Sequence, residues 1–500
     1  MTSKPIAAPL AGLILSASLA LSGCVSLDPK YSRPAAPVPA AWPSGAAYAP
    51  TEQAGPPAAD IGWRDFFTDP KLRAVIELAT AQNRDLRVAL INIQAARAQY
   101  VIQRAARLPT IDAQGAGTIE QVPAASFGAP SSAEERIHVY SAGLGVSDYE
   151  LDLWGRVKSL SKASFEQYLA TAEAARASRI SIVAETADAY LTLAADSERL
   201  ALAKDALGRD QESLDITQAR FKDGIASELD VRQAETAVEQ ARAAVAADTT
   251  LGAQDVNALN LVVGATVPAE LLPDNLSRLA PTLPDVPAGL SSTVLLRRPD
   301  VLEAEHQLRG DNANIGAARA AFFPTIELTA QGGTTAVSLS SLFQPGTSSF
   351  AFTPTVTLPI FDTGANHAKL NYAKAERDAA VAQYEKAIQS AFSDVANALA
   401  QRGTAGELVS ANEDLTRSSQ AAYDLAKARY EKGVEAYLDT LTAEIALFNA
   451  EQSLVSARLT RVTNIVALYR ALGGGVTASS VPEKTKSDVH HGMDQGYGNP

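Results

Sequence analysis

The sequence predicts a mainly α-helical chain with a small transmembrane β part, built from two copies of one plan. Three observations predict this fold class. Long proline-free stretches are rich in alanine, glutamate, arginine and leucine, short segments alternate apolar with small polar residues, and the two halves repeat each other at a fixed spacing. Only 6% of the residues are aromatic. That composition favours long packed helices over a conventional globular core.

Residues 1–23 have the pattern of a signal peptide. An apolar stretch from Ile6 to Leu21 is interrupted by Pro9 and Gly12, so a secretory signal fits better than a spanning helix. The ending "LSGC" resembles a bacterial lipobox, in which Cys24 receives diacylglycerol and becomes the mature N-terminus. Each buried acyl CH2 then contributes about 0.8 kcal/mol to membrane binding. The alternative is a buried or accidental cysteine.

Residues 24–60 are expected to form a lipid-anchored, extended N-terminal segment. Residues 25–60 hold eight prolines and many alanines, a composition typical of a tether. Val25 follows the cysteine, and by analogy with bacterial lipoproteins the lack of aspartate there favours the outer membrane. At the other end, residues 477–500 are polar and predict a disordered tail.

An internal duplication is visible at one spacing. The segment "RFKDGIASELD" at 220–230 returns as "RYEKGVEAYLD" at 429–439. The offset is 429 − 220 = 209, and the same offset relates Gly264 to Gly473 without a gap. We expect the glycine in each copy to take the left-handed conformation that closes a helix, so that each copy is the turn of a helical hairpin.

The duplication extends upstream and defines two structural repeats. The segment from Asp85 pairs with the segment from Asp300, and both continue to the word "PTI". Each half therefore contains a helix, "PTI", a strand pair and a long helical hairpin. We place the first repeat at 61–290 and the second at 291–476.

Segments with period two follow "PTI" in each half. The alternating apolar positions are Tyr140, Ala142, Leu144 and Val146, then Ile326, Leu328 and Ala330, then Phe350, Phe352, Val356, Leu358 and Ile360, with Ile111 to Ile119 as a weaker fourth segment. About ten residues with one apolar face suit a barrel strand in a membrane, although an ordinary half-buried antiparallel sheet alternates in the same way. Four strands cannot close a barrel, so several chains would have to share one.

The long stretches without proline predict coiled-coil helices. Steps of four and three connect Leu441, Ile445, Phe448, Val455, Leu459, Val462, Val466 and Tyr469, and similar steps connect Ile180, Val183, Ala187, Tyr190 and Ala194. A helix from Gly155 to about Phe221 would be roughly 100 Å long. No soluble core requires that length, and a span across a compartment would account for it.

Charge and residue types argue against several function classes. The net charge of −13 and the lack of a Lys/Arg cluster argue against nucleic acid as a partner. The single cysteine rules out an intramolecular disulfide, and the five histidines form no pair at helical ligand spacing. We assign the acids of "EAEH" at 303–306 to helix capping and a polar face. No metal, no catalytic residue and no cofactor besides the lipid is therefore expected.

Five sequence words together carry a family resemblance. They are "WRDFFTDPKL" at 63–72, "YELDLWGRV" at 149–157, "RRPDVLEAEHQLRGDNANIGAARAAFFPTIEL" at 297–328, "LPIFDTG" at 358–364 and "ARYEKGVEAYLDTLTAE" at 428–444. The chain resembles the TolC-like outer membrane efflux proteins (outer membrane factors), particularly the lipoprotein subgroup called NodT or OprM. The resemblance implies a homotrimer whose chains each give four strands to a twelve-stranded barrel above a periplasmic α-helical barrel. It also implies a periplasmic adaptor (membrane fusion) protein and an inner-membrane pump, often of the RND type.

Part of this fingerprint has plain structural reasons. Asp69 with Pro70 predicts a helix N-cap followed by proline at the first helical position, and Asp300 with Glu303 fits a capping box. Gly155 and Gly364 mark strand-to-helix turns, where a side chain would obstruct the backbone.

The hairpin turns supply the candidate docking residues. Arg220 and Gly224 in the first copy, and Arg429 and Gly433 in the second, would be tips available to an adaptor.

The resemblance implies a gate in the second copy only. There Asp439 faces the threefold axis at the narrowest point and forms a cation-attracting ring, with Leu438 as an apolar constriction and Tyr430 as a latch. The residues alone give Asp439, like Asp230, a helix-start role favoured by the helix dipole. Thr442 stands where many relatives place a further aspartate.

These features predict an outer membrane channel of a tripartite efflux system in a Gram-negative bacterium, a passive conduit gated by its periplasmic helical tips. One alternative is a periplasmic adaptor, which should have a single dominant hairpin beside a soluble lipoyl-like module. Another is a structural envelope lipoprotein, which needs no barrel strands. The sequence names neither the cargo nor the pump.

Overall fold

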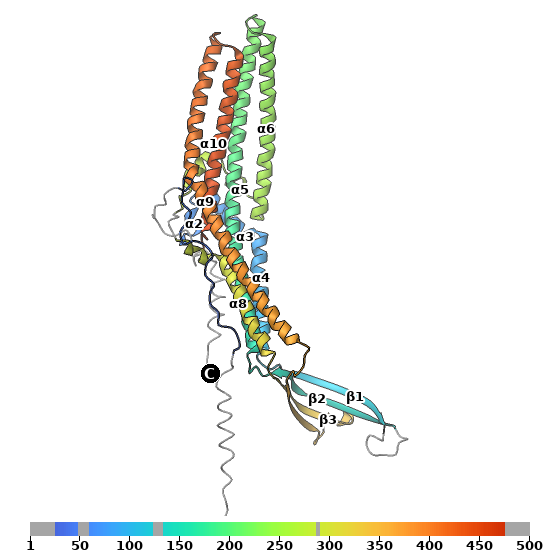
Figure 1. Ribbon diagram of the computed structural model, residues 1–500. Helices are drawn as coiled ribbons and strands as arrows, with labels where there is room; N and C mark the ends of the chain where they lie inside the picture. The colour runs from blue at the N-terminus through green and yellow to red at the C-terminus, as the bar shows by residue number, and fades with distance from the viewer. Residues whose placement is uncertain (1–25, 49–59, 124–133, 287–290, 476–500) are drawn as a thin grey trace, which may run out of the picture. The chain divides into compact units, whose positions relative to one another are not determined.

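The computed structural model describes residues 26–48, 60–123, 134–286 and 291–475 (Figure 1). The predicted signal peptide, Cys24 and the predicted tail lie outside these residues. The chain divides into two compact units. The strand unit comprises Met1–Pro34, Ile93–Ala170 and Ala304–Gln383, and the hairpin unit comprises Ala35–Asn92, Thr171–Glu303 and Tyr384–Pro500. Each unit takes segments from both halves of the sequence, because the longest helices contribute residues to both.

Four antiparallel strands form a single sheet in the strand unit. They are β1 (Asp112–Pro123), β2 (Glu134–Glu150), β3 (Thr325–Ala336) and β4 (Ser348–Thr357), in the order β1-β2-β3-β4. All four predicted strands are confirmed, and β2 is longer than expected, at 17 residues. Among the described residues β1 and β4 each pair along one side only. The sheet exposes large apolar side chains, namely Ile119, Leu144, Phe350, Phe352 and Val356.

Aromatic packing fixes the junction between the sheet and its helices. The ring of Trp154 stacks on Phe323 at 4.6 Å, and its indole N–H donates to the carbonyl of Pro324 at 2.9 Å. These residues belong to the words "YELDLWGRV" and "AAFFPTIEL". Gly155 has φ +72° and Gly364 has φ +86°, so both predicted glycine turns are confirmed. The predicted obstruction was wrong at Gly364, because a Cβ added there would meet nothing within 4 Å, and the left-handed backbone is the reason for glycine.

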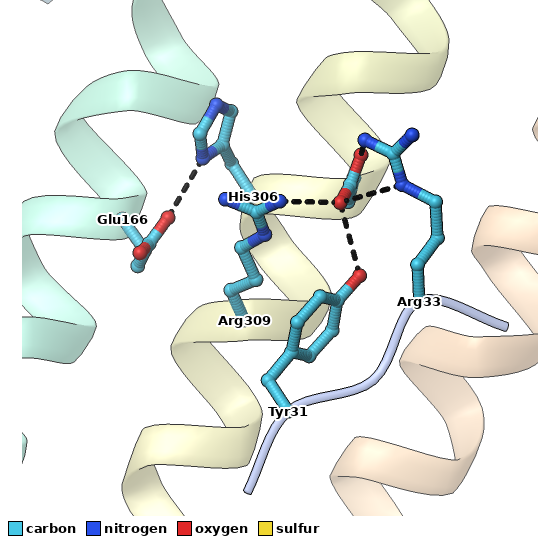
Figure 2. A network of polar contacts seen from close by, with 6 residues as sticks. Tyr31, Arg33, Glu166, His306 and Arg309 are labelled. Carbon is cyan, nitrogen blue, oxygen red and sulfur yellow. Dashed lines mark hydrogen bonds and ion pairs between the residues drawn. The ribbon is translucent and has the colours of Figure 1, made fainter. Parts of the chain in front are cut away.

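A buried carboxylate holds the N-terminal segment against helix α8 (Pro299–Ala320). Glu305, only 2% exposed, accepts hydrogen bonds from Arg33 at 2.5 and 3.0 Å, from Arg309 at 2.6 Å and from the Tyr31 hydroxyl at 3.1 Å. Figure 2 shows the three donors around this one side chain. Next to it His306 bonds Glu166 at 2.7 Å. The expectation of a polar helix face at Glu305 was wrong, because the N-terminal segment covers it.

Further contacts fix the rest of this segment, residues 27–33, which we name the strap. Asp28 accepts from the Ser159 hydroxyl at 2.5 Å and pairs with Lys162 at 3.0 Å. Arg319 donates to the carbonyl of Leu27 at 3.0 Å. A Cβ added to Gly316 would lie 1.9 Å from Asp28 Oδ1, so only glycine leaves room for the strap there.

The second half of each repeat is one long helical hairpin (Figure 1). The first is α5 (Arg156–Lys222) with α6 (Glu228–Val263), and the second is α9 (Ala365–Glu431) with α10 (Tyr437–Ala471). Both α5 and α9 have 67 residues, so the single long helix predicted from Gly155 is confirmed. No helix in the described part of the chain is both long and apolar enough to cross a membrane.

The remaining elements are shorter than the hairpin helices. They are α2 (Trp63–Phe66), α3 (Pro70–Gln82), α4 (Arg84–Ala105) and α7 (Leu276–Leu279), with 3-10 turns at Ala269–Leu271, Ala280–Thr282, Ser292–Arg297 and Leu339–Ser341. Asp69 caps α3 by accepting from Leu72 N–H at 2.7 Å, with Pro70 at the first helical position, as predicted.

The predicted capping box at Asp300 was wrong. Helix α8 begins at Pro299, so Asp300 lies inside the helix. Its carboxylate pairs with Arg298 at 2.6 Å, and Arg298 also donates to the carbonyl of Ala471 at 2.7 Å. Arg298 of the "RRPD" motif therefore links the start of α8 to the end of α10 within the hairpin unit.

The apolar positions predicted from heptad spacing are buried in part. Val183, Ala187, Tyr190 and Ala194 are buried, and so are Val455, Val462, Val466 and Tyr469. Nearer the turn of α10 the buried face is displaced, because Ile445 is exposed while Glu444 beside it is buried. There α10 packs through a different face than heptad spacing predicts.

We expect Glu305→Ala to release the strap. Arg33 and Arg309 lose their shared partner but remain partly exposed, so water replaces part of the contact and the loss should be about 1–3 kcal/mol. Trypsin should then cleave after Lys30 several-fold faster. Glu77→Ala breaks an exposed pair with Arg64 and serves as the control. Equal cleavage rates in both variants would contradict the assigned role of Glu305.

Candidate functional site

The two hairpin turns are backbone copies of each other. Gly224 has φ +72° and Gly433 has φ +73°, which confirms the predicted left-handed conformation. Gly224 N–H donates to the carbonyl of Phe221 at 3.0 Å, and Gly433 N–H donates to the carbonyl of Tyr430 at 2.8 Å. Both turns lie at the same end of the hairpin unit (Figure 1). The repeat therefore reproduces the turn geometry closely.

The aspartates that follow the two turns have different surroundings. In the first hairpin Ser227 and Asp230 form a capping box, with Asp230 accepting from Ser227 N–H at 2.8 Å and Ser227 Oγ accepting from Asp230 N–H at 3.2 Å. In the second hairpin Ala436 stands at the N-cap and makes no side-chain bond. The exposed Asp439 carboxylate has no hydrogen bond or ion pair with any described residue. The fold thus uses one aspartate of the pair and leaves the other free.

Tyr430 fastens the second hairpin to the first. It is buried, and its hydroxyl lies 2.9 Å from Thr217 Oγ1 on α5. The guanidinium of Arg220 lies over its ring at 4.4 Å and donates to the carbonyl of Glu431 at 3.0 Å. The two hairpin ends of one chain are therefore joined directly. We name Thr217, Arg220 and Tyr430 the tip latch.

The structure separates the other predicted site residues. Leu438 is 52% exposed and lies beside the exposed Asp439, away from the buried setting of Tyr430. Arg429 pairs with Glu435 of its own turn at 3.0 Å, unlike its counterpart Arg220, which reaches across to the other hairpin. The latch residue is thus distinct from the two residues predicted for the constriction.

A buried charged cluster behind the tips was missed from the sequence. Arg209 Nε on α5 donates to Glu444 Oε1 on α10 at 3.2 Å, and its Nη2 lies 3.6 Å from Glu451. Burial, and then the neighbouring charge of Asp210, raise the pKa of Glu444 to about 7. This glutamate was not found from the sequence, because heptad spacing predicted that Ile445, and not Glu444, is buried.

Comparison with known proteins agrees with this geometry. The family model described as outer membrane efflux protein matches residues 75–265 and 290–474. This chain belongs to the outer membrane efflux protein family. Two relatives from Pseudomonas putida, the antibiotic efflux pump outer membrane protein ArpC and the toluene efflux pump outer membrane protein TtgC, are each 47% identical over 91% of this chain and 93% of the relative. The open state of the MtrE outer membrane channel of Neisseria gonorrhoeae has TM-score 0.81 and 38% identity, covering 92% of this chain and 100% of that one.

Membership in the outer membrane efflux protein family establishes the class of function. The protein is an outer membrane channel of a tripartite efflux system, a transport role rather than an enzymatic one. The predicted location and channel function are confirmed. A periplasmic adaptor or a structural lipoprotein, the two alternatives left by the sequence, does not fit this family.

The asymmetry of the two aspartates can be measured. Asp230→Ala removes one half of a capping box and should destabilise the start of α6 by about 1 kcal/mol. Amide hydrogen exchange in the first turn of α6 should then accelerate about fivefold. Asp439→Ala, the matched change in the second hairpin, should alter exchange at the start of α10 much less. Equal acceleration in both variants would show that Asp439 also has a capping role.

Proposed function

We propose that three copies of this chain share one twelve-stranded barrel in the outer membrane and that their hairpins continue it as a helical tube in the periplasm. The observation that carries the proposal is the pair of unpaired edges on a sheet with exposed apolar residues. Each peptide group without a partner in lipid costs several kcal/mol, so the edges must be closed. Pairing β4 of one copy with β1 of the next closes them, and a trimer gives 3 × 4 = 12 strands.

The strap supports a lipid anchor at Cys24. The cysteine lies four residues before Asp28, so it reaches at most about 14 Å from it. Asp28 is bonded to Ser159 in the first turns of α5, shortly after β2 ends at Glu150. Acyl chains on Cys24 would thus enter the bilayer near the ends of the strands. The anchor and the sheet would then meet the same leaflet.

The hairpin turns are the proposed docking surface for a periplasmic adaptor, which would link the channel to an inner-membrane pump, most simply of the RND type. Both turns are exposed, and each presents an apolar residue, Ile225 or Val434, beside its glycine. Of the predicted docking residues we retain Gly224, Gly433 and Arg429. Arg220 is engaged with Tyr430, so we assign it to the tip latch.

Leu438 and Asp439 are the proposed gate. The free carboxylate of Asp439 would form a ring of three negative charges that attracts cations, with Leu438 as an apolar constriction beside it. The tip latch, through Tyr430, would hold the second hairpin in position. Opening is then a movement of the hairpins and involves no chemistry on the cargo.

The choice of cargo belongs to the pump in this proposal. Relatives of equal similarity are named for antibiotics and for toluene. Such different cargoes are consistent with a conduit that does not select among them.

We expect Asp439→Ala to weaken block of the channel by divalent cations at least about tenfold, a loss of about 1.4 kcal/mol in cation binding. The block is measured as single-channel conductance in planar bilayers. Asp223→Ala removes the same charge from an exposed position in the first turn and serves as the control. Unchanged block in Asp439→Ala would exclude the acidic ring.

We expect Gly433→Pro to impair export while trimers still assemble. Proline fixes φ near −65° and has no N–H, so it fits neither the φ of +73° nor the 2.8 Å bond to the carbonyl of Tyr430. The strands that would join the copies lie in the other unit. Sensitivity to toxic compounds and native gel electrophoresis measure the two effects. Gly433→Ala keeps the N–H and should be milder, and loss of trimers would instead make this turn an assembly determinant.

A further inference from the structure

The buried charged cluster behind the tips joins two hairpins that are far apart in sequence. Asp210 on α5 and Glu444 on α10, which we name the acid pair, lie close enough for each carboxyl group to perturb the other. The Glu444 side chain is only 4% exposed, and Asp210 is also buried. Along the sequence, Asp210 lies about four turns of helix before Gly224, and Glu444 lies about three turns after Gly433. The tip latch lies between the acid pair and the turns.

The cluster contains too little positive charge for its acids. Arg209 contacts Glu444 at 3.2 Å and Glu451 at 3.6 Å, and it also faces Asp210. Titratable and charged groups surround the acid pair on three helices. They are Asp205, Arg209 and Glu212 on α5, Tyr423, Lys427 and Tyr430 on α9, and Tyr437 and Glu451 on α10. Lys427 is paired with Glu212. One guanidinium therefore serves a closely spaced group of buried acids. Two buried carboxyl groups so close together cannot both be ionised without a large cost.

Unsatisfied polar atoms mark the same place independently. The hydroxyls of Tyr423 and Tyr437 and the Oε2 atom of Glu444 are buried and have no hydrogen-bond partner among the described residues. Both tyrosines are almost fully buried. Buried polar atoms are normally paired. The unpaired Oε2 of Glu444 is the one of these three atoms that can accept a proton, because both tyrosine hydroxyls already carry theirs.

The internal duplication shows that the fold does not require this cluster. The offset of 209 relates Arg209, Asp210 and Glu444 to Ser418, Ser419 and Glu235. Glu235 is 39% exposed and pairs with Arg232 on its own helix at 2.8 Å. The duplicated positions thus hold hydroxyls on α9 and a surface ion pair on α6, where α5 and α10 hold buried charges.

We propose that Asp210 and Glu444 share one proton and that this proton keeps the two hairpins of a chain together behind their tips. When the proton leaves, two buried carboxylates face one guanidinium, and their repulsion separates α5 from α10. The Tyr430–Thr217 bond joins the same two hairpins, so the tip latch loosens with it. The proton site stands without the proposed gate, and only the effect on the channel rests on the proposed function.

The direction of the pH dependence follows from the raised pKa. An ordinary glutamate titrates near 4.5, and burial together with Asp210 raises the pKa of Glu444 to about 7. A raised carboxyl pKa means that the folded contact prefers the protonated form. The contact is therefore fully stable below about 4.5 and is lost as the pH rises through about 7.

The test uses the full-length protein purified in detergent, at about pH 5 and about pH 8, on either side of the raised pKa. Infrared difference spectra should show a buried carboxyl that loses its proton between the two conditions. The signal should be absent in Glu444→Gln and shifted to lower pH in Asp210→Asn, where the neighbouring charge is removed. Glu235→Gln, the duplicated position, should leave it unchanged. A signal that persists in Glu444→Gln would overturn the proposal.

Spin labels on Lys222→Cys and Lys432→Cys, one near each turn, test the movement without any assay of transport. The label distance should broaden at about pH 8 in the parent, and it should stay narrow at both pH values in Glu444→Gln and Asp210→Asn. Two variants on opposite helices keep the test decisive if one of them folds poorly. A parent distance that does not change with pH would refute the coupling even if the proton is found. Because neither readout measures transport, its result is independent of whether the gate at Asp439 exists.

Discussion

The pairing of backbone groups at the sheet edges is the constraint on which the rest of the structure depends. A single chain supplies four strands with two free edges and an exposed apolar surface. In lipid such an edge has no water to bond, so a single chain would be incomplete in the proposed barrel. In that proposal identical copies supply matching edges, and a ring of copies leaves none free. The junctions below the sheet must then be rigid, which explains the Trp154–Phe323 stack and the glycine turns beside it.

The duplication separates what the fold needs from what one copy does in addition. Both copies keep the left-handed glycine and the same backbone bonds at the hairpin turn. They differ in their side chains, since Asp230 caps its helix whereas Asp439 is free, and Arg220 crosses to the other hairpin whereas Arg429 stays in its own turn. The backbone of the turn is thus common to both copies, whereas its side chains stabilise the first helix start and leave the second free for another role.

Sequence patterns predicted the regular elements well, and their failures have a common cause. Alternation located all four strands, and the glycines located both turns, because these signals are local. Glu305 and Glu444 were missed because the residues that cover them, Arg33 and Asp210, are distant in the sequence. Heptad spacing assumes one packing face along α10, whereas the buried face changes near Glu444. The resemblance implied a latch at Tyr430, but it could not show that Thr217 is its partner.

The two buried glutamates show how the same residue can be a fixed contact in one place and a titratable one in another. Burial alone would raise the pKa of Glu305, but the hydrogen bonds of Arg33 and Arg309 outweigh it and leave the pKa lowered. Glu305 therefore stays charged near neutral pH, and its hold on the strap is lost only as the medium becomes acidic. Glu444 has one shared guanidinium and a carboxylate neighbour, so its pKa moves the other way, to about 7. The number of cations around each carboxylate thus decides which contact is permanent. The strap that leads from the proposed anchor stays bound at neutral pH, while the proposed proton site behind the hairpin tips titrates there.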